Sequence, residues 1–491
     1  MSQTKINIAI EYHKKRQFES AKKIYQELII SEKNNFFPLF LLGTLEMDLR
    51  NFDEAINLLN MSLNKNPSYK DTYLNLGSIY YELNNYKECI KYYELGKNNY
   101  HLNENNDDTH YKLCQNLARA YKNIGEIDKA RDVYEEMYLK NESDLKIVFF
   151  LYELNALSLD KNLKKKIKNI LKNKNSSKSN LLYGNLLLSK YAKNADMHSE
   201  EYRALLSFHN VIYEENKIRF ENLNDFIFNK LAKINQYYDE KLEIRNDKKI
   251  RELTNPIFII SLPRSGSTLL EKIIIYNQKN LLSGEETEIF STIGEDYYKN
   301  SNTPPNLQNI SQIIIEQYKK KKLISDKHNI SFTDKSIDNF YYLGWIKKIF
   351  PNAKFIHCIR DPKAIIVSIL RNLFAESSWS HNIKDILSFM DNHHRLINYW
   401  QNAHGIEIYN VKYENLINNF DTETFNLLKF CNLKWTPDIV KFNSSLNFVS
   451  KTASNIQIRQ PIYKTIDRSY ESLASQFKND LKKYSWSNYS F

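Results

Sequence analysis

A short polar turn in the middle of the chain carries the residues most suited to chemistry. The apolar segment 257–261 predicts a buried strand, and helical spacing resumes over residues 269–275. A turn between a strand and a helix points unpaired backbone N–H groups and the positive end of the helix dipole at one place. The turn also supplies a guanidinium, three hydroxyls and a glycine, in the order Pro263, Arg264, Ser265, Gly266, Ser267 and Thr268. This composition suits the binding of a phosphate-like anion.

The turn differs from the common nucleoside-triphosphate loop in two ways. It has no first glycine, and no lysine precedes the hydroxyl residue. A plain strand–turn–helix with hydroxyl caps is the structural alternative. We therefore expect a phosphate-like ligand, and we keep a P-loop kinase or NTPase as an alternative function of another class.

The turn resembles the 5′-phosphosulfate loop of sulfotransferases that use 3′-phosphoadenosine 5′-phosphosulfate (PAPS). Residues 283–287, Ser-Gly-Glu-Glu-Thr, resemble a segment of the protein-tyrosine sulfotransferases. The second glutamate of that segment is the catalytic base, and it corresponds here to Glu286. Residues 333–335, Thr-Asp-Lys, resemble the family segment whose lysine stabilises the transferring group, and this lysine corresponds to Lys335.

Three later segments resemble the nucleotide-binding parts of the same family, in the same order along the chain. A segment that ends in Arg360, with Ser368 eight residues later, resembles the 3′-phosphate site. Tyr413 stands where the family has a tyrosine that contacts the nucleotide. Residues 452–461 resemble the late loop that closes over PAPS, with Ser454 in the contacting position. The resemblance is closest to sulfotransferases that carry tetratricopeptide repeats.

The resemblance also assigns roles in the reaction. Sulfuryl transfer needs a base at the acceptor hydroxyl and cations near the oxygen that leaves. The implied catalytic residues are Glu286 as the base, with Lys335, Arg264 and Ser454. The implied PAPS-binding residues are Pro263, Arg264, Ser265, Gly266, Ser267, Thr268, Arg360, Ser368, Tyr413 and Ser454. His328 is the rival base, because other sulfotransferases use a histidine.

No metal is expected in this reaction. His393 and His394 are adjacent, and the sequence around them lacks the ligand spacing of a metal site. One departure from the protein-tyrosine enzymes concerns a disulfide. In that family it joins the segment that corresponds to residues 283–287, called the glutamate loop below, to the segment that corresponds to residues 333–335 and carries the lysine. Those two positions are Ser283 and Thr333 here, so the disulfide cannot form. The acceptor stays open between protein tyrosine, a saccharide and a small hydroxylated metabolite.

The first third of the chain repeats with a period of 34 residues. Ala21, Ala55 and Cys89 follow this period, and Gly43 and Gly77 follow it as well. A fourth unit, with Ala130 in the small-residue position, arrives seven residues late. The period is that of the tetratricopeptide repeat, in which small residues stand where two helices cross. Such repeats predict a protein partner, or recruitment of the acceptor.

We therefore predict a multidomain chain, with an all-α tetratricopeptide solenoid followed by an α/β, P-loop-like sulfotransferase domain built on a parallel sheet. The expected ranges are about four repeats over residues 1–145, a helical bridging region or degenerate repeats over residues 146–250, and the PAPS-dependent domain over residues 251–491. Strands are expected at residues 257–261, 354–359 and 406–411. PAPS should lie at their carboxyl ends.

Composition narrows the class of partner. The chain has 69 Lys and Arg against 58 Asp and Glu, a net charge of +11 that first indicates nucleic acid. The basic residues are spread out, however, and PAPS is itself an anion, so we expect no nucleic-acid partner. The four scattered cysteines give no disulfide framework. With no apolar leader and no apolar run of membrane-spanning length, we expect no membrane span and a cytoplasmic location. A non-catalytic repeat scaffold is the remaining alternative, and the joint presence of the candidate site residues argues against it.

Overall fold

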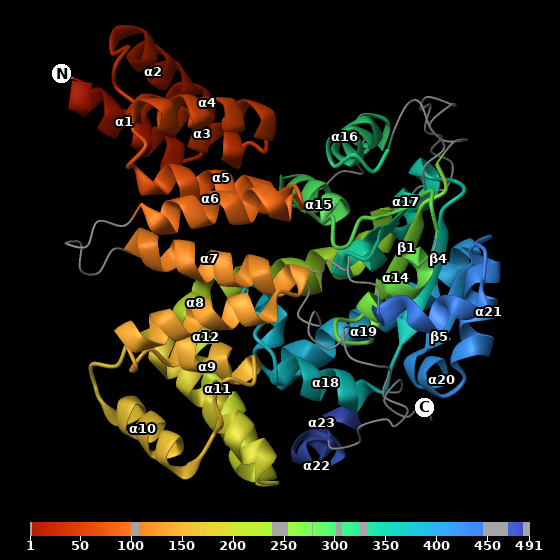
Figure 1. Cartoon of the computed structure of the whole chain (residues 1–491). Helices are drawn as coiled ribbons and strands as arrows, with labels where there is room; N and C mark the ends of the chain where they lie inside the picture. The colour runs from red at the N-terminus through yellow and green to blue at the C-terminus, as the bar shows by residue number, and fades with distance from the viewer. Residues whose placement is uncertain are drawn as a thin grey trace. The chain divides into compact units, whose positions relative to one another are not determined.

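The computed structural model describes residues 2–99, 108–237, 254–276, 278–300, 307–324, 331–444 and 470–484. These residues belong to two compact units (Figure 1). The first unit lies before Leu159, and the second contains the described residues from Leu159 onward. Each unit has a core of its own.

The first unit is helical, and successive helices pack on one another in pairs (Figure 1). Its helices are α1 (Ser2–Lys14), α2 (Phe18–Ser31), α3 (Phe37–Asp48), α4 (Phe52–Lys65), α5 (Lys70–Glu82), α6 (Tyr86–Asn98), α7 (Asp108–Ile124), α8 (Ile127–Lys140) and α9 (Leu145–Glu153). This arrangement confirms the predicted helical repeat region.

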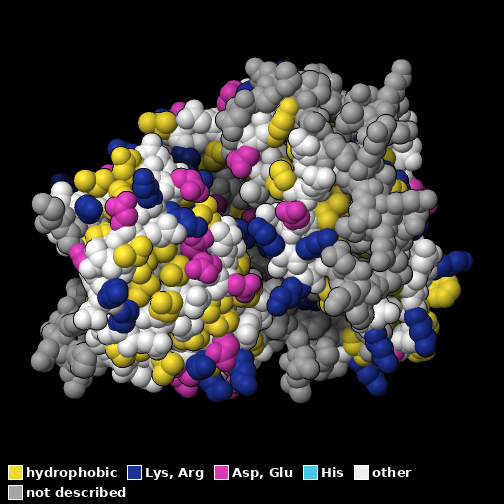
Figure 2. All heavy atoms as spheres, turned by 90° about the horizontal axis from the view of Figure 1, so that it is seen from above, with side chains coloured by type: hydrophobic (Ala, Val, Ile, Leu, Met, Phe, Trp, Pro, Cys, Tyr) yellow, Lys and Arg dark blue, Asp and Glu magenta, His cyan; other side chains and the backbone are white. Residues whose placement is uncertain are grey.

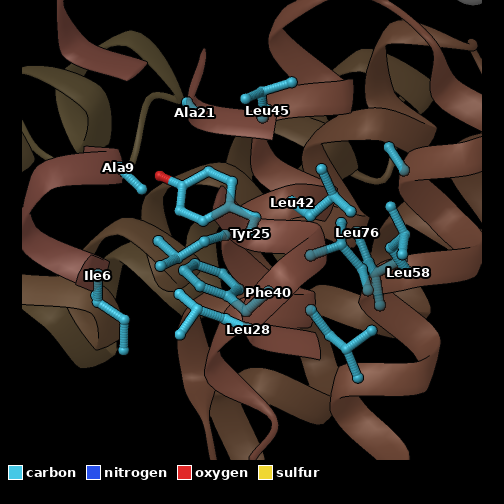
Figure 3. Close-up of a cluster of buried hydrophobic side chains, with 14 of the residues drawn as sticks. Ile6, Ala9, Ala21, Tyr25, Leu28, Phe40, Leu42, Leu45, Leu58 and Leu76 are labelled. Carbon is cyan, nitrogen blue, oxygen red and sulfur yellow. The ribbon is translucent and has the colours of Figure 1, made fainter. Parts of the chain in front are cut away.

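The 34-residue period has a packing cause. Ala21, Ala55, Cys89 and Ala130 are all fully buried where helices cross. A Cβ atom on Gly77 would lie 2.3 Å from the Tyr93 ring, so a larger residue there would force the two helices apart. Figure 3 shows a core cluster of the first unit, with Tyr25 and Phe40 packed between leucines of neighbouring helices.

The second unit contains a five-stranded sheet in the order β2-β3-β1-β4-β5. All neighbouring strands are parallel. The strands are β1 (Ile257–Ser261), β2 (Leu281–Ser283), β3 (Ser331–Asp334), β4 (Lys354–Ile359) and β5 (Ile408–Lys412). The predicted strands at β1 and β4 are confirmed, and β5 begins two residues later than predicted. The strands β2 and β3, of three and four residues, were not predicted.

Helices cover both faces of this sheet (Figure 1). Alternate residues of β1 divide between the two faces. Ile257 and Ile259 join the core that includes α14, whereas Phe258 packs against Phe290 and Phe332 on the other face. The helices and turns of this part are α14 (Ser267–Ile275), α15 (Ile289–Asn300), α16 (Leu307–Lys320), η3 (Ile337–Tyr342), α17 (Leu343–Ile349), α18 (Pro362–Leu370), η4 (Ser378–Ser380), α19 (Ile383–His404), α20 (Tyr413–Asn418), α21 (Phe420–Phe430), η5 (Pro437–Ser444), α22 (Tyr470–Ala474), η7 (Ser475–Phe477) and α23 (Lys478–Leu481).

The strand order places the polar turn at the switch point of the sheet. From β1, the chain leads first to β2 and β3 on one side and then to β4 and β5 on the other. The residue directly after β3 is Lys335, the residue directly after β4 is Arg360, and the residue directly after β5 is Tyr413. Three predicted site residues therefore stand at the carboxyl edge of the sheet, where open α/β sheets bind ligands.

A further set of helices packs within the second unit, on the α/β domain. These are α10 (Lys161–Lys172), α11 (Lys178–Asn194) and α12 (His198–Asp225), followed by η1 (Phe226–Lys230) and η2 (Leu231–Tyr237). The buried Glu201 of α12 accepts two hydrogen bonds from Arg371, at 2.6 and 3.1 Å. The His209 Nε2 atom lies 3.0 Å from the Leu370 carbonyl oxygen, just before that arginine. The predicted domain ranges stay predictions, and this packing joins α12 to the α/β domain.

No helix among the described residues is long and apolar enough to cross a membrane. On the face shown in Figure 2, Lys and Arg side chains are interspersed with Asp and Glu side chains. This mixing matches the spread of charge along the sequence.

The contact between α12 and the α/β domain can be tested by removing one carboxylate. Glu201→Ala leaves the Arg371 charge largely buried and unpaired, so we expect a loss of about 3–5 kcal/mol of unfolding free energy. No tryptophan stands before Leu159 in the sequence, so tryptophan fluorescence does not follow the denaturation of the first unit. Glu200→Ala, at an exposed position of the same helix, should change the free energy by less than about 0.5 kcal/mol. Equal effects of the two substitutions would contradict the assigned contact.

Candidate active site

The turn after β1 has the backbone geometry of an anion cradle. Arg264 has a φ of 68° and Gly266 a φ of 104°, so two residues of the turn are left-handed. No side chain caps the N-terminus of α14, and its first-turn N–H groups stay directed into the turn. A Cβ atom on Gly266 would lie 2.5 Å from the Tyr413 ring. Both the positive φ and this lack of space therefore require glycine at position 266.

The hydroxyls of this turn do not share one role. The buried Ser265 donates its hydroxyl to the Leu262 carbonyl at 2.7 Å, which holds the turn closed. Its own carbonyl accepts the Cys358 thiol at 3.2 Å. Ser267 and Thr268 start α14 and stand at its positive end. Ser265 therefore shapes the turn, and the side chains of Ser267 and Thr268 are the better candidates for ligand contact.

The predicted 3′-phosphate residues come together beside this turn. The Arg264 Nε atom donates to the Ser368 hydroxyl at 2.8 Å, and an Arg360 Nη1 atom donates to the Arg264 carbonyl at 2.9 Å. The Arg360 guanidinium also lies over the Tyr413 ring, 4.6 Å from its centre. Two guanidiniums, a hydroxyl and an aromatic face thus share one place, which suits a phosphate attached to a flat base.

The two residues predicted for the reacting groups form an ion pair. The Lys335 Nζ atom lies 2.9 Å from the Glu286 Oε1 atom. The Lys335 side chain is completely buried, whereas 39% of the Glu286 side chain is exposed. Burial alone lowers the pKa of Lys335, but the charges of Glu286, Glu271 and Glu285 outweigh it and raise the pKa above its ordinary value. The site therefore holds a permanent ammonium next to an accessible carboxylate.

The buried Glu271 of α14 fastens the glutamate loop to β3. Its Oε1 atom accepts hydrogen bonds from the Ser283 hydroxyl and the Glu285 N–H, both at 3.1 Å, and from the Thr333 hydroxyl at 2.6 Å. Ser283 and Thr333 also pair directly in the sheet. The carboxylate of Glu271 thus links the two positions that the protein-tyrosine enzymes join by a disulfide.

Further contacts fix the backbone around Glu286. Glu285 and Glu288 have φ values of 53° and 56°, and left-handed residues of this kind cluster at functional sites. A Cβ atom on Gly284 would lie 2.1 Å from the Thr333 carbonyl oxygen, so only glycine lets the loop approach β3. The Lys335 N–H donates to the Glu285 carbonyl at 2.8 Å. Glu286 and Lys335 are therefore held by one continuous hydrogen-bonded backbone.

Asp334 organises the segment after β3. Its fully buried carboxylate accepts hydrogen bonds from Ser336, Asn339, Tyr318 and Thr287. These donors come from α16, the glutamate loop and the chain that follows Lys335. They set the direction in which the chain leaves the sheet, and hence the position of the lysine.

The remaining predictions divide in two groups. Ser454 and the rival base His328 lie outside the described residues. No group of metal-binding side chains was found among the described residues, and His393 is a core residue, fully buried against Phe340 and His357. Glu271 was missed from the sequence. A signal existed, because Glu271 and Lys272 are charged residues that stand between the apolar residues 269–270 and 273–275 of α14.

Comparisons with known proteins agree with this description of the two units. Residues 256–437 match the model of the sulfotransferase family. Residues 71–96 and 111–137 match the tetratricopeptide repeat. The predicted recognition, a sulfotransferase with tetratricopeptide repeats, is confirmed by these two matches, and the α/β part of the chain matches a sulfotransferase domain.

Individual relatives are distant. An uncharacterized protein of Aquifex aeolicus (strain VF5) is 22% identical over 72% of this chain. The chain spans about half, 48%, of the length of that curated relative. Among solved structures, the sulfotransferase domain of the Synechococcus PCC 7002 olefin synthase is 18% identical, with a TM-score of 0.32 over 48% of this chain and 98% of that one. A sulfotransferase domain from the curacin biosynthetic pathway is 17% identical, with a TM-score of 0.27 over 46% of this chain and 98% of that one.

The role of Glu271 gives a prediction that needs no substrate. Glu271→Ala removes the acceptor of three donors, so we expect faster amide hydrogen exchange over residues 283–286. Glu271→Gln keeps an acceptor oxygen and is the matched control, with exchange close to that of the native chain.

A second arm of this experiment replaces the lost link by a covalent one. The paired positions 283 and 333 lie on neighbouring strands, which are about 4.8 Å apart, within the range that a disulfide spans. Ser283→Cys with Thr333→Cys, oxidised in the Glu271→Ala background, should restore slow exchange. Unchanged exchange in Glu271→Ala would show that the carboxylate does not hold the loop.

Proposed function

We propose that this protein transfers the sulfuryl group of PAPS to the hydroxyl of an acceptor. The observation that carries the proposal is the Lys335–Glu286 pair, which stands at the same edge of the sheet as the cradle after β1. The match of residues 256–437 to the sulfotransferase family supports the class of reaction. The donor, the acceptor and the individual roles below belong to the proposal.

On the donor side, the turn 263–268 holds the 5′-phosphosulfate through its backbone N–H groups and the hydroxyls of Ser267 and Thr268. Arg360 and Ser368 hold the 3′-phosphate, and the Tyr413 ring faces the adenosine. The contacts among Arg264, Arg360, Ser368 and Tyr413 support this placement, because they bring two positive charges and a donor hydroxyl to one place. Ser454 keeps its predicted role as a further donor.

On the acceptor side, Glu286 is the general base. It takes the proton of the acceptor hydroxyl as that oxygen forms a bond to sulfur. The bond between sulfur and the 5′-phosphate oxygen breaks, and its electron pair stays on the phosphate. Negative charge therefore grows on the leaving phosphate, where Lys335 and Arg264 stabilise it. The exposure of Glu286 supports its role, since a base must reach a ligand, and the burial of Lys335 keeps its charge unscreened.

The repeats supply the recruiting surface for a protein, either a partner or the acceptor itself. We place the protein in the cytoplasm and keep the predicted domain ranges, 1–145, 146–250 and 251–491. Protein tyrosine, a saccharide and a small hydroxylated metabolite are the candidate acceptors. The match of repeats to residues 71–96 and 111–137 supports the recruiting role.

The donor is tested by ligand-induced stabilisation. A ligand that binds only the folded state raises its stability, so 3′-phosphoadenosine 5′-phosphate should raise the melting temperature. At a hundredfold excess over its Kd, the unfolding free energy should increase by about 2.7 kcal/mol. Arg360→Ala should weaken binding of this nucleotide far more than binding of adenosine 5′-phosphate, which lacks the 3′-phosphate. A larger stabilisation by ATP with magnesium would favour the kinase or NTPase alternative instead.

The base is tested by conservative substitution. Glu286→Gln should leave nucleotide affinity nearly unchanged and lower turnover with PAPS by about 10²–10⁴-fold, the usual contribution of a general base. Glu285→Gln, next to it, is the matched control and should have a mild effect. If Glu285→Gln lowers turnover as much, or if His328→Ala does, then Glu286 is not the base.

A further inference from the structure

A cavity of about 380 Å³ opens beside Glu286. The glutamate loop, α15, η3 and the segment around η4 surround it, all within the second unit. This volume lies within the range of small-ligand sites, about 300–1,000 Å³. Because the cavity includes the accessible carboxylate of the Lys335–Glu286 pair, it is the space in which an acceptor hydroxyl meets the proposed base.

The lining of this cavity has charge of one sign. Within the described residues, it contains five carboxylates and no Lys or Arg, the acidic residues being Glu286, Glu288, Glu295, Asp296 and Asp338. Lys335 contacts Glu286 alone in this group. Asp338 forms no hydrogen bond or ion pair with a described residue. Burial and then the charges of Glu295 and Glu288 raise the pKa of Asp338 to about 7.

A second, independent feature of the same cavity points to a ligand. Trp379 lines the cavity and is only 5% exposed, with one face of its indole stacked on Phe389 at 3.9 Å between ring centres. Its N–H finds no acceptor among the described residues, although a buried indole N–H usually has one.

These two features call for different groups on one molecule. The carboxylates attract a cation. The N–H of Trp379 needs an acceptor oxygen. A hydroxyl compound that also carries a protonated amine supplies both, and its hydroxyl is the group that Glu286 deprotonates.

We propose that the acceptor is a small hydroxyl compound with a protonated amine, which the acidic cavity beside Glu286 selects by charge. The proposal rests on the proposed function, because it names the acceptor of the same site. It also favours the small-metabolite acceptor over an acidic tyrosine peptide, whose carboxylates the cavity repels.

Three phenols that differ mainly in charge test the proposal. Tyramine carries an ammonium, 4-ethylphenol is neutral and 4-hydroxyphenylacetate carries a carboxylate. Their affinities for the full-length protein are measured by ligand-observed NMR with 3′-phosphoadenosine 5′-phosphate present, and their rates of sulfation are measured with labelled PAPS. We expect tyramine to bind about fivefold more tightly than 4-ethylphenol, the upper end for a solvent-exposed ion pair, and 4-hydroxyphenylacetate to bind most weakly.

Substitutions locate the preference in the cavity. Glu295→Gln with Asp338→Asn should abolish the advantage of tyramine while leaving the affinity for 4-ethylphenol nearly unchanged. Trp379→Phe, which keeps a ring and removes the N–H, should weaken the binding of all three phenols. Glu407→Gln also removes a carboxylate charge, at an exposed residue just before β5 at the opposite edge of the sheet, and should change none of the affinities.

The measurements of nucleotide binding and of phenol binding test the two proposals separately. If 3′-phosphoadenosine 5′-phosphate does not bind and no phenol is sulfated, the proposed function fails, and the charge order measured without nucleotide still decides the inference. If tyramine binds no better than 4-ethylphenol, or if its advantage survives in the Glu295→Gln, Asp338→Asn double variant, the proposal is overturned.

Discussion

The buried ammonium of Lys335 sets the main constraint on this active site. A charge without any exposed side-chain surface is tolerated only when opposite charges and hydrogen bonds surround it. Glu286 supplies the contact at 2.9 Å, and Glu271 and Glu285 add their charges. The glutamate loop, the end of β3 and α14 must therefore keep fixed positions relative to one another, because a shift of any of them would leave a buried charge unpaired.

The contacts around the pair follow from this constraint. Glu271 reaches from α14 to both the loop and β3, and Gly284 allows the loop to lie against the Thr333 carbonyl. The same α14 begins at the cradle after β1, so the helix that holds the glutamate loop also directs its N-terminus at the proposed donor site. One rigid helix thus relates the donor side of the site to the acceptor side. Hydrogen bonds to Glu271 link the two positions at which the protein-tyrosine sulfotransferases have a disulfide.

The sequence predicted those parts of the site that depend on local pattern. The run of isoleucines in β1, the arginine at the end of β4 and the tyrosine at the end of β5 each carry a local signal, and the parallel sheet brings them to one edge. The short strands β2 and β3 carried no such signal, since three or four residues are too few to show a period. The repeats were predictable for a related reason: Gly77 must be small because Tyr93 fills the space beside it, and the constraint recurs at every helix crossing.

Other features depend on contacts between distant parts of the chain and could not be predicted from pattern alone. The acidic cavity joins Glu286, Glu295 and Asp338 to Trp379, which lies more than 40 residues further along the chain. The link from Glu271 to Thr333 spans 62 residues. The docking of α12 joins Glu201 to Arg371, which are 170 residues apart. In each case, the residue types are common ones, and only the fold brings these residues close together.

The most direct measurement is a crystal structure of the full chain with 3′-phosphoadenosine 5′-phosphate bound. We predict that the 5′-phosphate lies in the turn 263–268, facing the Lys335–Glu286 pair, and that the 3′-phosphate contacts Arg360 and Ser368. A nucleotide bound away from the carboxyl edge of the sheet, or bound there with its two phosphates exchanged, would contradict the proposed sulfuryl transfer.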